Sequence, residues 1–130
     1  FSGDAYFMPR GYAPEGYFGE EATRDFRKMF RILHENVDAF TSSDVEPLIP
    51  TLIPGTFANR FRADEKVIWT VFNANYRTVE GKLLEIGGQP GAGYVDLWKG
   101  APITTTTVGG TASLVVEIGP RDVACILGIH

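Results

Sequence analysis

The stretch that decides the fold is Val67-Ile68-Trp69-Thr70-Val71-Phe72. Its residues are mostly β-branched or aromatic, and both alternating faces are apolar except at Thr70, which is typical of a strand covered on both sides. We therefore expect this strand to lie in the centre of a sheet. Just upstream, segment 57–61 alternates with a period of two, and the polar segment 62–66 predicts the hairpin loop that joins the two strands.

Short strand-like segments continue to the C-terminus at spacings of about 8–12 residues, separated by glycine and proline turns. This spacing is typical of antiparallel sandwiches and barrels. We predict a mainly β fold, an antiparallel β-sandwich of about seven or eight strands. The strands expected after the central one are 78–86, with a bulge at Gly81, and 93–98, 102–107, 111–118 and 123–129.

The N-terminal part of the sequence has a different pattern. Residues 20–37 carry apolar side chains at helical spacing, which predicts one amphipathic helix. Three prolines divide residues 45–55, which predicts an extended connector or an edge strand. The expected apolar stripe of the helix is Phe26, Met29, Phe30, Leu33, Val37 and Phe40.

Segment 1–18 mixes aromatic residues with prolines and glycines, which predicts an irregular, extended arm. Its aromatic side chains either pack on the protein or a neighbour, or form an exposed platform for sugars or a partner. We divide the chain into the arm, helix and proline-rich connector at 1–56 and the β-sandwich at 57–130. Because the sequence begins with Phe1 rather than methionine, we expect processing, excision or truncation upstream.

The composition excludes several classes of partner. The net charge is -4 and no basic stripe exists, so nucleic acid is not expected to bind. No apolar run approaches the roughly 18 residues of a membrane span. The only cysteine, Cys125, lies in an apolar run and is expected to be a buried thiol, which excludes an internal disulfide and favours a reducing compartment only weakly. The cellular location stays unknown.

Several segments together resemble a known kind of domain. They are 57–61, Ile68–Asn73, Gly81–Ile86, Tyr94–Gly100, Ala112–Val116 and Pro120–Ala124. Their order and turns resemble the C-terminal β-sandwich that follows the (β/α)-barrel in many glycoside hydrolases, including the α-amylase clan. The resemblance covers about residues 20–129 and implies that the helix is the last barrel helix, with an upstream barrel as its missing partner. Because the catalytic carboxylates of such enzymes lie on barrel strands, it also implies that this chain alone lacks catalysis.

The candidate binding site lies on the expected strand 93–98. Alternation places Tyr94, Asp96 and Trp98 on one face. Aromatic rings can stack on sugars and a carboxylate can accept hydroxyl hydrogen bonds, so these three residues are a candidate carbohydrate site. A packed sheet face with one hydrogen-bonded carboxylate is the alternative interpretation.

Other chemistry has little support in the sequence. His34, Glu35 and Asp38 lie on a helix like part of a zinc site, but the second histidine is missing, so we expect no metal. The glycine-rich segment 87–93 lacks the lysine and helix of a phosphate loop, and we expect no cofactor and no catalytic residue. The favoured hypothesis is a non-catalytic accessory domain that contacts carbohydrate. The alternative is a self-assembling structural subunit that docks on copies of itself through its arm and edge strands, such as Thr104–Thr107.

Overall fold

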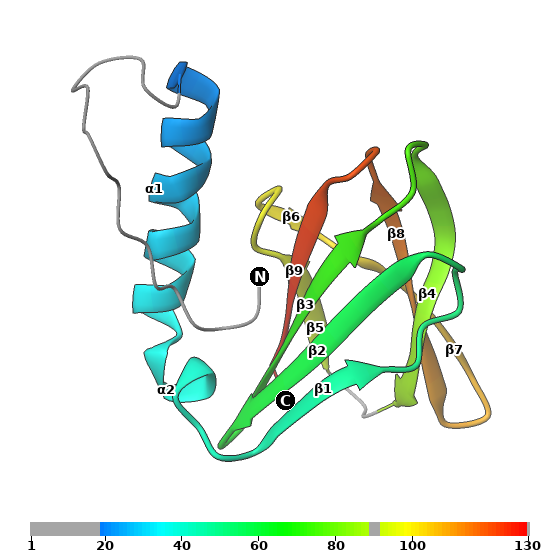
Figure 1. The fold of residues 1–130 in the computed structure, drawn as a ribbon. Helices are drawn as coiled ribbons and strands as arrows, with labels where there is room; N and C mark the ends of the chain where they lie inside the picture. The colour runs from blue at the N-terminus through cyan, green and yellow to red at the C-terminus, as the bar shows by residue number, and fades with distance from the viewer. Residues whose placement is uncertain (1–18, 89–91, 130) are drawn as a thin grey trace.

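The computed structural model describes residues 19–88 and 92–129, so the predicted arm at 1–18, the tip of the glycine-rich loop and His130 lie outside the described residues. The described residues form two helices beside a two-layered β-sandwich (Figure 1). The elements are α1 (Gly19–Glu35), α2 (Val37–Phe40), β1 (Val45–Ile49), β2 (Thr56–Ala63), β3 (Lys66–Asn73), β4 (Val79–Gly87), β5 (Gly93–Asp96), β6 (Ala101–Pro102), β7 (Thr104–Val108), β8 (Thr111–Ile118) and β9 (Val123–Ile129).

The strands form two antiparallel sheets of unequal size. The larger sheet has the order β1-β2-β3-β9-β5-β6, and the smaller has the order β4-β8-β7. β3 contains the apolar stretch 67–72 and pairs with β2 on one side and β9 on the other, so the prediction of a central strand is confirmed. The predicted antiparallel β-sandwich with an N-terminal helix is confirmed as well, with nine described strands rather than seven or eight.

The larger sheet is covered on both faces by different partners. On its inner face, Val67, Trp69 and Ile126 pack in one cluster with Leu84 and Leu114 of the smaller sheet, and all five are at most 4% exposed. Its outer face packs on the helices. That second cluster contains Ile32, Ala39, Phe40, Phe61, Ile68 and Cys125. Cys125 is a free, fully buried thiol, as the sequence predicts.

The apolar stripe of the helix differs from the expected one. Ile32 is only 2% exposed although the expected stripe omits it, whereas Val37 is 56% exposed. The buried positions Ile32, Asn36 and Phe40 follow one another at spacings of four residues, whereas Val37 and Phe30, seven residues earlier, both lie outside this face. Asn36 Nδ2 donates to the Ile32 carbonyl at 2.9 Å, and its backbone leaves the helical conformation where α1 ends and α2 begins.

The proline-rich connector includes the edge strand β1, which pairs with β2. Its register shifts between Glu46 and Ile49, where Leu48 has a positive φ of 52° and donates its N–H to the Asn59 side chain. The register irregularity of β4 lies between Lys82 and Leu84, just after the bulge expected at Gly81. After β1, the Leu52 N–H donates to the Leu83 carbonyl at 2.8 Å and ties the connector to the smaller sheet.

Candidate functional site

Asp96 ends strand β5 and holds the turn that follows. Its Oδ1 accepts the backbone N–H groups of Trp98 at 2.8 Å, Lys99 at 3.3 Å and Cys125 at 3.5 Å. The Gly100 N–H donates to the Asp96 carbonyl and closes the turn. A short acidic side chain that accepts from the backbone two residues later forms an Asx turn, which is why alternation stops here. Asp96 is 4% exposed, so this carboxylate is a buried part of the turn.

Tyr94 lies in the core between the two sheets. It faces Gly128 across the β5–β9 pair, and its ring lies 6.3 Å from that of Trp69 at an interplanar angle of 47°. A Cβ at Gly128 would lie only 2.9 Å from the Tyr94 ring, so the glycine makes room for it. The Tyr94 hydroxyl is buried and has no hydrogen-bond partner in the part of the chain that the structure describes, and burial raises the pKa of this group.

Trp98 lies on the other side of the larger sheet, in the turn after β5. It is partly buried against the cluster of the outer face, and the Lys28 ammonium of α1 lies 4.5 Å from its ring centroid. The prediction that one strand runs from 93 to 98 and places three site residues on one face is therefore wrong at Trp98. Only Tyr94 and Asp96 share a strand, and Trp98 meets Asp96 through its backbone N–H.

The acidic residues of the helices do not assemble a metal site. Among residues 19–88 and 92–129, no three histidine, cysteine, aspartate or glutamate side chains cluster closely enough to hold a metal ion. Asp38 instead pairs with Lys66 at 2.7 Å, and this hydrogen bond lowers the pKa of the Asp38 carboxyl. The pair joins α2 to the start of β3, so Asp38 has a structural partner. Neither described helix is long and apolar enough to cross a membrane.

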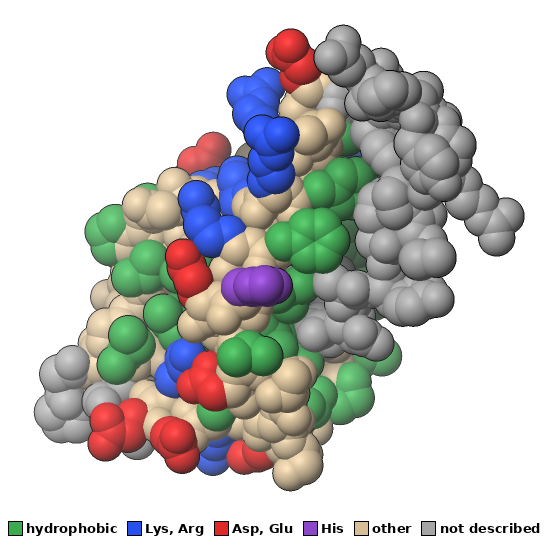
Figure 2. Space-filling model, turned by 90° about the vertical axis from the view of Figure 1, so that its left-hand side faces the viewer, with side chains coloured by type: hydrophobic (Ala, Val, Ile, Leu, Met, Phe, Trp, Pro, Cys, Tyr) green, Lys and Arg blue, Asp and Glu red, His purple; other side chains and the backbone are tan. Residues whose placement is uncertain are grey.

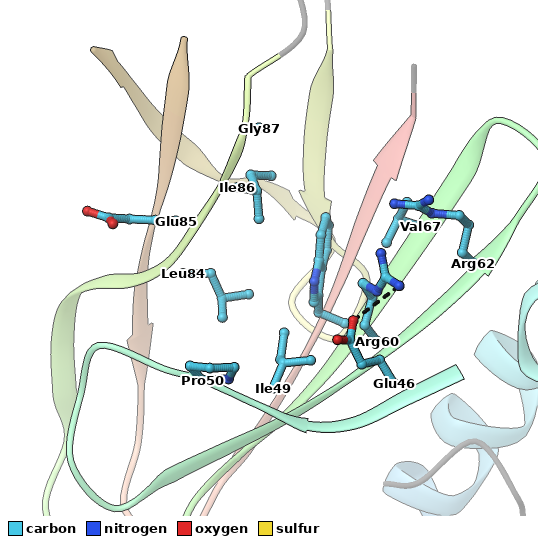
Figure 3. A pocket seen from close by; sticks show the side chains of 11 residues that line it. Glu46, Ile49, Pro50, Arg60, Arg62, Val67, Leu84, Glu85, Ile86 and Gly87 are labelled. Carbon is cyan, nitrogen blue, oxygen red and sulfur yellow. Dashed lines mark ion pairs between the residues drawn. The ribbon is translucent and has the colours of Figure 1, made fainter. Parts of the chain in front are cut away.

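A cavity of about 440 Å³ lies at the open side of the sandwich, between the edge strands β1 and β4 (Figure 3). Figure 3 shows Ile49, Leu84 and Ile86 pointing into it, while Glu85 points away. The residues that line this groove, as we call it, are Glu46, Ile49, Pro50, Arg60, Arg62, Val67, Trp69, Leu84, Glu85, Ile86 and Gly87.

The groove is absent from the predictions made from sequence because its residues come from four strands. Its one sequence signal is the pair Arg60 and Arg62 on the face of β2 that Ala58 shares, where a core strand would carry apolar residues. In the structure Arg60 pairs with Glu46 at 3.1 Å, across the β1–β2 ladder. The groove therefore combines an apolar interior with a charged rim.

Comparison with known proteins shows similarity only at the level of the fold. No protein-family model matches the chain, and no curated protein sequence is detectably similar to it. An α-amylase from Anoxybacillus matches 88% of this chain with a TM-score of 0.62 at 11% identity. An α-amylase from H. orenii matches 100% of it with a TM-score of 0.54 at 15% identity. A structure of AmyP in complex with maltose matches 87% of it with a TM-score of 0.52 at 16% identity.

These matches cover only a small part of the larger proteins. The chain spans 24% of the Anoxybacillus amylase chain, 27% of the H. orenii chain and 22% of the AmyP chain. The match to the H. orenii enzyme extends over the whole of this chain. The fold of this chain is thus shared with a portion, about a quarter, of larger amylase-like glycoside hydrolase chains, in agreement with the resemblance found in the sequence.

Proposed function

We propose that this chain is a non-catalytic accessory β-sandwich domain of a larger glycoside hydrolase, in which α1 is the last helix of an upstream (β/α)-barrel. The observation that carries the proposal is the shared fold, because it extends over most or all of this chain and only about a quarter of the amylases. A domain of this kind covers one side of a barrel and stabilises it.

The position of α1 supports a neighbour on the helix. Figure 1 shows α1 beside the larger sheet and remote from the smaller one. Ile32 anchors α1 in the outer cluster at 2% exposure, whereas Phe30, two residues earlier, is 38% exposed. Figure 2 shows hydrophobic side chains along one side of this region and Lys and Arg side chains on the other. An apolar side that remains partly exposed on such a helix is suited to pack against another domain.

The buried carboxylate also supports a structural role. Asp96 is the only buried acidic residue of the part of the chain that the structure describes. Because its Oδ1 already accepts three backbone N–H groups, the carboxylate serves the turn rather than a reacting substrate.

The test is the coding region upstream of Phe1 and the longer product that it encodes. We expect a (β/α)-barrel there and aryl-glycoside hydrolysis by the longer product, with none by residues 1–130 alone. Substitution Phe30→Ser should lower the melting temperature of the longer product more than that of the short chain. Arg27→Ser, which alters an exposed helix residue, is the matched control. An unrelated upstream fold, or turnover by the short chain, would contradict the proposal.

Carbohydrate contact is a separate part of the proposal. Of the three candidate residues it rests on Trp98, which retains partial exposure, because Tyr94 and Asp96 are buried. Titration with malto-oligosaccharides should shift the indole N–H signal of Trp98 in ¹H–¹⁵N correlation NMR spectra, and Trp98→Ala should abolish binding. Unchanged spectra at high sugar concentration would remove carbohydrate from the proposed function and leave the accessory role intact.

Self-assembly is the second candidate function, and the edge strand β7 favours it. All five of its side chains are exposed, and among the described strands it pairs only with β8. An exposed, regular strand edge is a template for pairing with another chain. Light scattering at rising protein concentration should then show a dimer or larger species. Thr107→Pro should dissociate it, because in the register of β7 with β8 the Thr107 N–H faces the free edge. A strict monomer at every concentration would exclude this candidate.

A further inference from the structure

The groove between β1 and β4 contains two buried hydrogen-bond donors that lack acceptors. Trp69 lines the groove and is only 4% exposed, yet its indole Nε1 has no hydrogen-bond partner among the described residues. The Nε of Arg60 is likewise buried and unpaired. Leaving a buried donor unpaired costs about 1–3 kcal/mol, so native proteins rarely do so outside sites where something else binds.

The two donors come from neighbouring strands in direct register. Arg60 on β2 lies opposite Trp69 on β3, so both side chains leave the same face of the sheet. The pairing of Arg60 with Glu46 and Asp44 uses its Nη2 atom and leaves the Nε atom without a partner. A ligand in the groove could therefore offer acceptor oxygens to both N–H groups at once.

The charges at the groove favour a neutral ligand. Two guanidinium groups, of Arg60 and Arg62, are matched by the carboxylates of Glu46 and Asp44. An anionic ligand would compete with Glu46 for Arg60. A cationic ligand would face the N–H groups of Trp69 and Arg60, which donate hydrogen bonds and cannot accept them. The groove therefore favours neither an anionic nor a cationic ligand.

The walls favour a ligand with an apolar body. Ile49, Pro50, Leu84 and Ile86 surround the space, and its volume of about 440 Å³ lies within the range of roughly 300–1,000 Å³ that is usual for small-molecule sites. The buried ring of Trp69 exposes no face on which a sugar could stack, so the groove is not suited to the stacking mode expected at Trp98.

We propose that this groove is a binding site for a small neutral molecule that combines carbonyl-type acceptor oxygens with an apolar body, such as an acyl amide. Its acceptors bond to Trp69 Nε1 and Arg60 Nε, and its apolar part packs on the side chains of β1 and β4. This inference does not depend on the proposed accessory role, because it uses only contacts within the sandwich.

The two tryptophans of the chain allow a direct test. They lie on opposite sides of the larger sheet, so their indole N–H signals report separately on the groove and on the turn after Asp96. The probe is N-acetyl-L-leucine methylamide, and Trp98→Phe assigns the remaining indole signal to Trp69. We expect the probe to shift the Trp69 signal alone, with a dissociation constant on the order of 1 mM.

Matched ligands and variants test each part of the chemistry. The glycine analogue of the probe lacks the apolar body, and N-acetyl-L-leucine carries a negative charge, so both should bind at least about fivefold more weakly. Arg60→Met should weaken the probe by a similar factor, whereas Arg24→Met on the exposed surface of α1 should leave it unchanged. No shift at Trp69, or equal or tighter binding of the anion or the glycine analogue, would overturn the proposal.

Discussion

The sandwich contains two sets of buried polar groups, and only one of them is satisfied by hydrogen bonds among the described residues. At one end of the sandwich, Asn73 is fully buried, and its Nδ2 donates to the carbonyls of Arg77, Ile118 and Gly119. Its Oδ1 accepts the Asn75 N–H at 2.9 Å. At the open side, the groove leaves the donors of Arg60 and Trp69 without acceptors.

The difference separates groups that hold the fold from groups that are available to a ligand. A satisfied buried network stabilises one arrangement of the loops around it, so removing it should be costly. An unsatisfied donor contributes no such bond, so removing it should cost little stability and change only binding. The largest and the smallest effects expected on stability follow from this contrast.

Asn73→Asp should have the largest effect. Aspartate keeps the shape but replaces the amide donors that face the three carbonyls with a negative charge, so the free energy of unfolding should fall by about 3–5 kcal/mol. Urea unfolding measures this change. Asn59→Asp is the control, because Asn59 Oδ1 accepts the Leu48 N–H and aspartate keeps that bond. An equal loss there would show that the amide donors of Asn73 are not the cause.

Asp96→Ala should have the next largest effect. It leaves the N–H groups of Trp98, Lys99 and Cys125 without their common acceptor, and the expected loss is about 2–4 kcal/mol. Asp96→Asn keeps an acceptor oxygen and should lose less than half as much. If thermal unfolding shows equal losses for both variants, the negative charge rather than the acceptor is what the turn requires.

Gly128→Ala tests the close packing of the inner core. The added Cβ would lie 2.9 Å from the Tyr94 ring and 3.2 Å from the Trp69 ring, and overpacking of this kind typically costs about 1–3 kcal/mol. Gly93→Ala on the adjacent strand is the matched control, since nothing lies within 4 Å of its added Cβ. A loss at Gly93 as large as at Gly128 would refute steric packing as the cause.

Cys125, beside the Asp96 turn, should make the free energy of unfolding depend on pH. Burial and the nearby Asp96 charge raise the pKa of the thiol to about 12, from a value of 9.0 in the absence of these effects. Between these values the unfolded chain has lost the thiol proton that the folded chain retains. The free energy of unfolding should therefore fall by about 1.4 kcal/mol per pH unit above pH 9. Cys125→Ala should remove that part of the slope, and an unchanged slope would contradict this account.

Much of the fold could be predicted from local patterns, because those patterns agree with the packing. The stretch 67–72 is apolar on both faces, and the structure buries both faces. Alternation fails at Trp98 because the hydrogen bonds of Asp96, a short polar side chain, bend the chain. The expected helical stripe fails for a different reason: packing on the larger sheet buries the face of Ile32, Asn36 and Phe40 and leaves Val37 exposed.

The candidate sites were less predictable because they depend on distant segments. The sequence places Tyr94 two positions before Asp96 and Trp98 two positions after it, whereas the structure places the two rings on opposite sides of the larger sheet. The groove requires β1 and β4 to face each other across two layers, and no spacing in the sequence encodes that arrangement. Only the two arginines on an inward face of β2 indicate it.

Arg60→Met should have the smallest effect on stability, because it removes an unsatisfied donor of the groove rather than a member of the satisfied Asn73 network. The exposed partners of Arg60 are Glu46 and Asp44, and such ion pairs are worth about 0–1 kcal/mol. Methionine keeps the aliphatic part of the side chain and removes the unpaired Nε. The stability lost with the ion pairs should therefore nearly cancel the stability gained by removing an unpaired buried donor. Urea unfolding should show a change within about 1 kcal/mol. A loss comparable to that of Asn73→Asp would mean that Arg60 supports the fold, and the groove would then be a structural feature rather than a binding site.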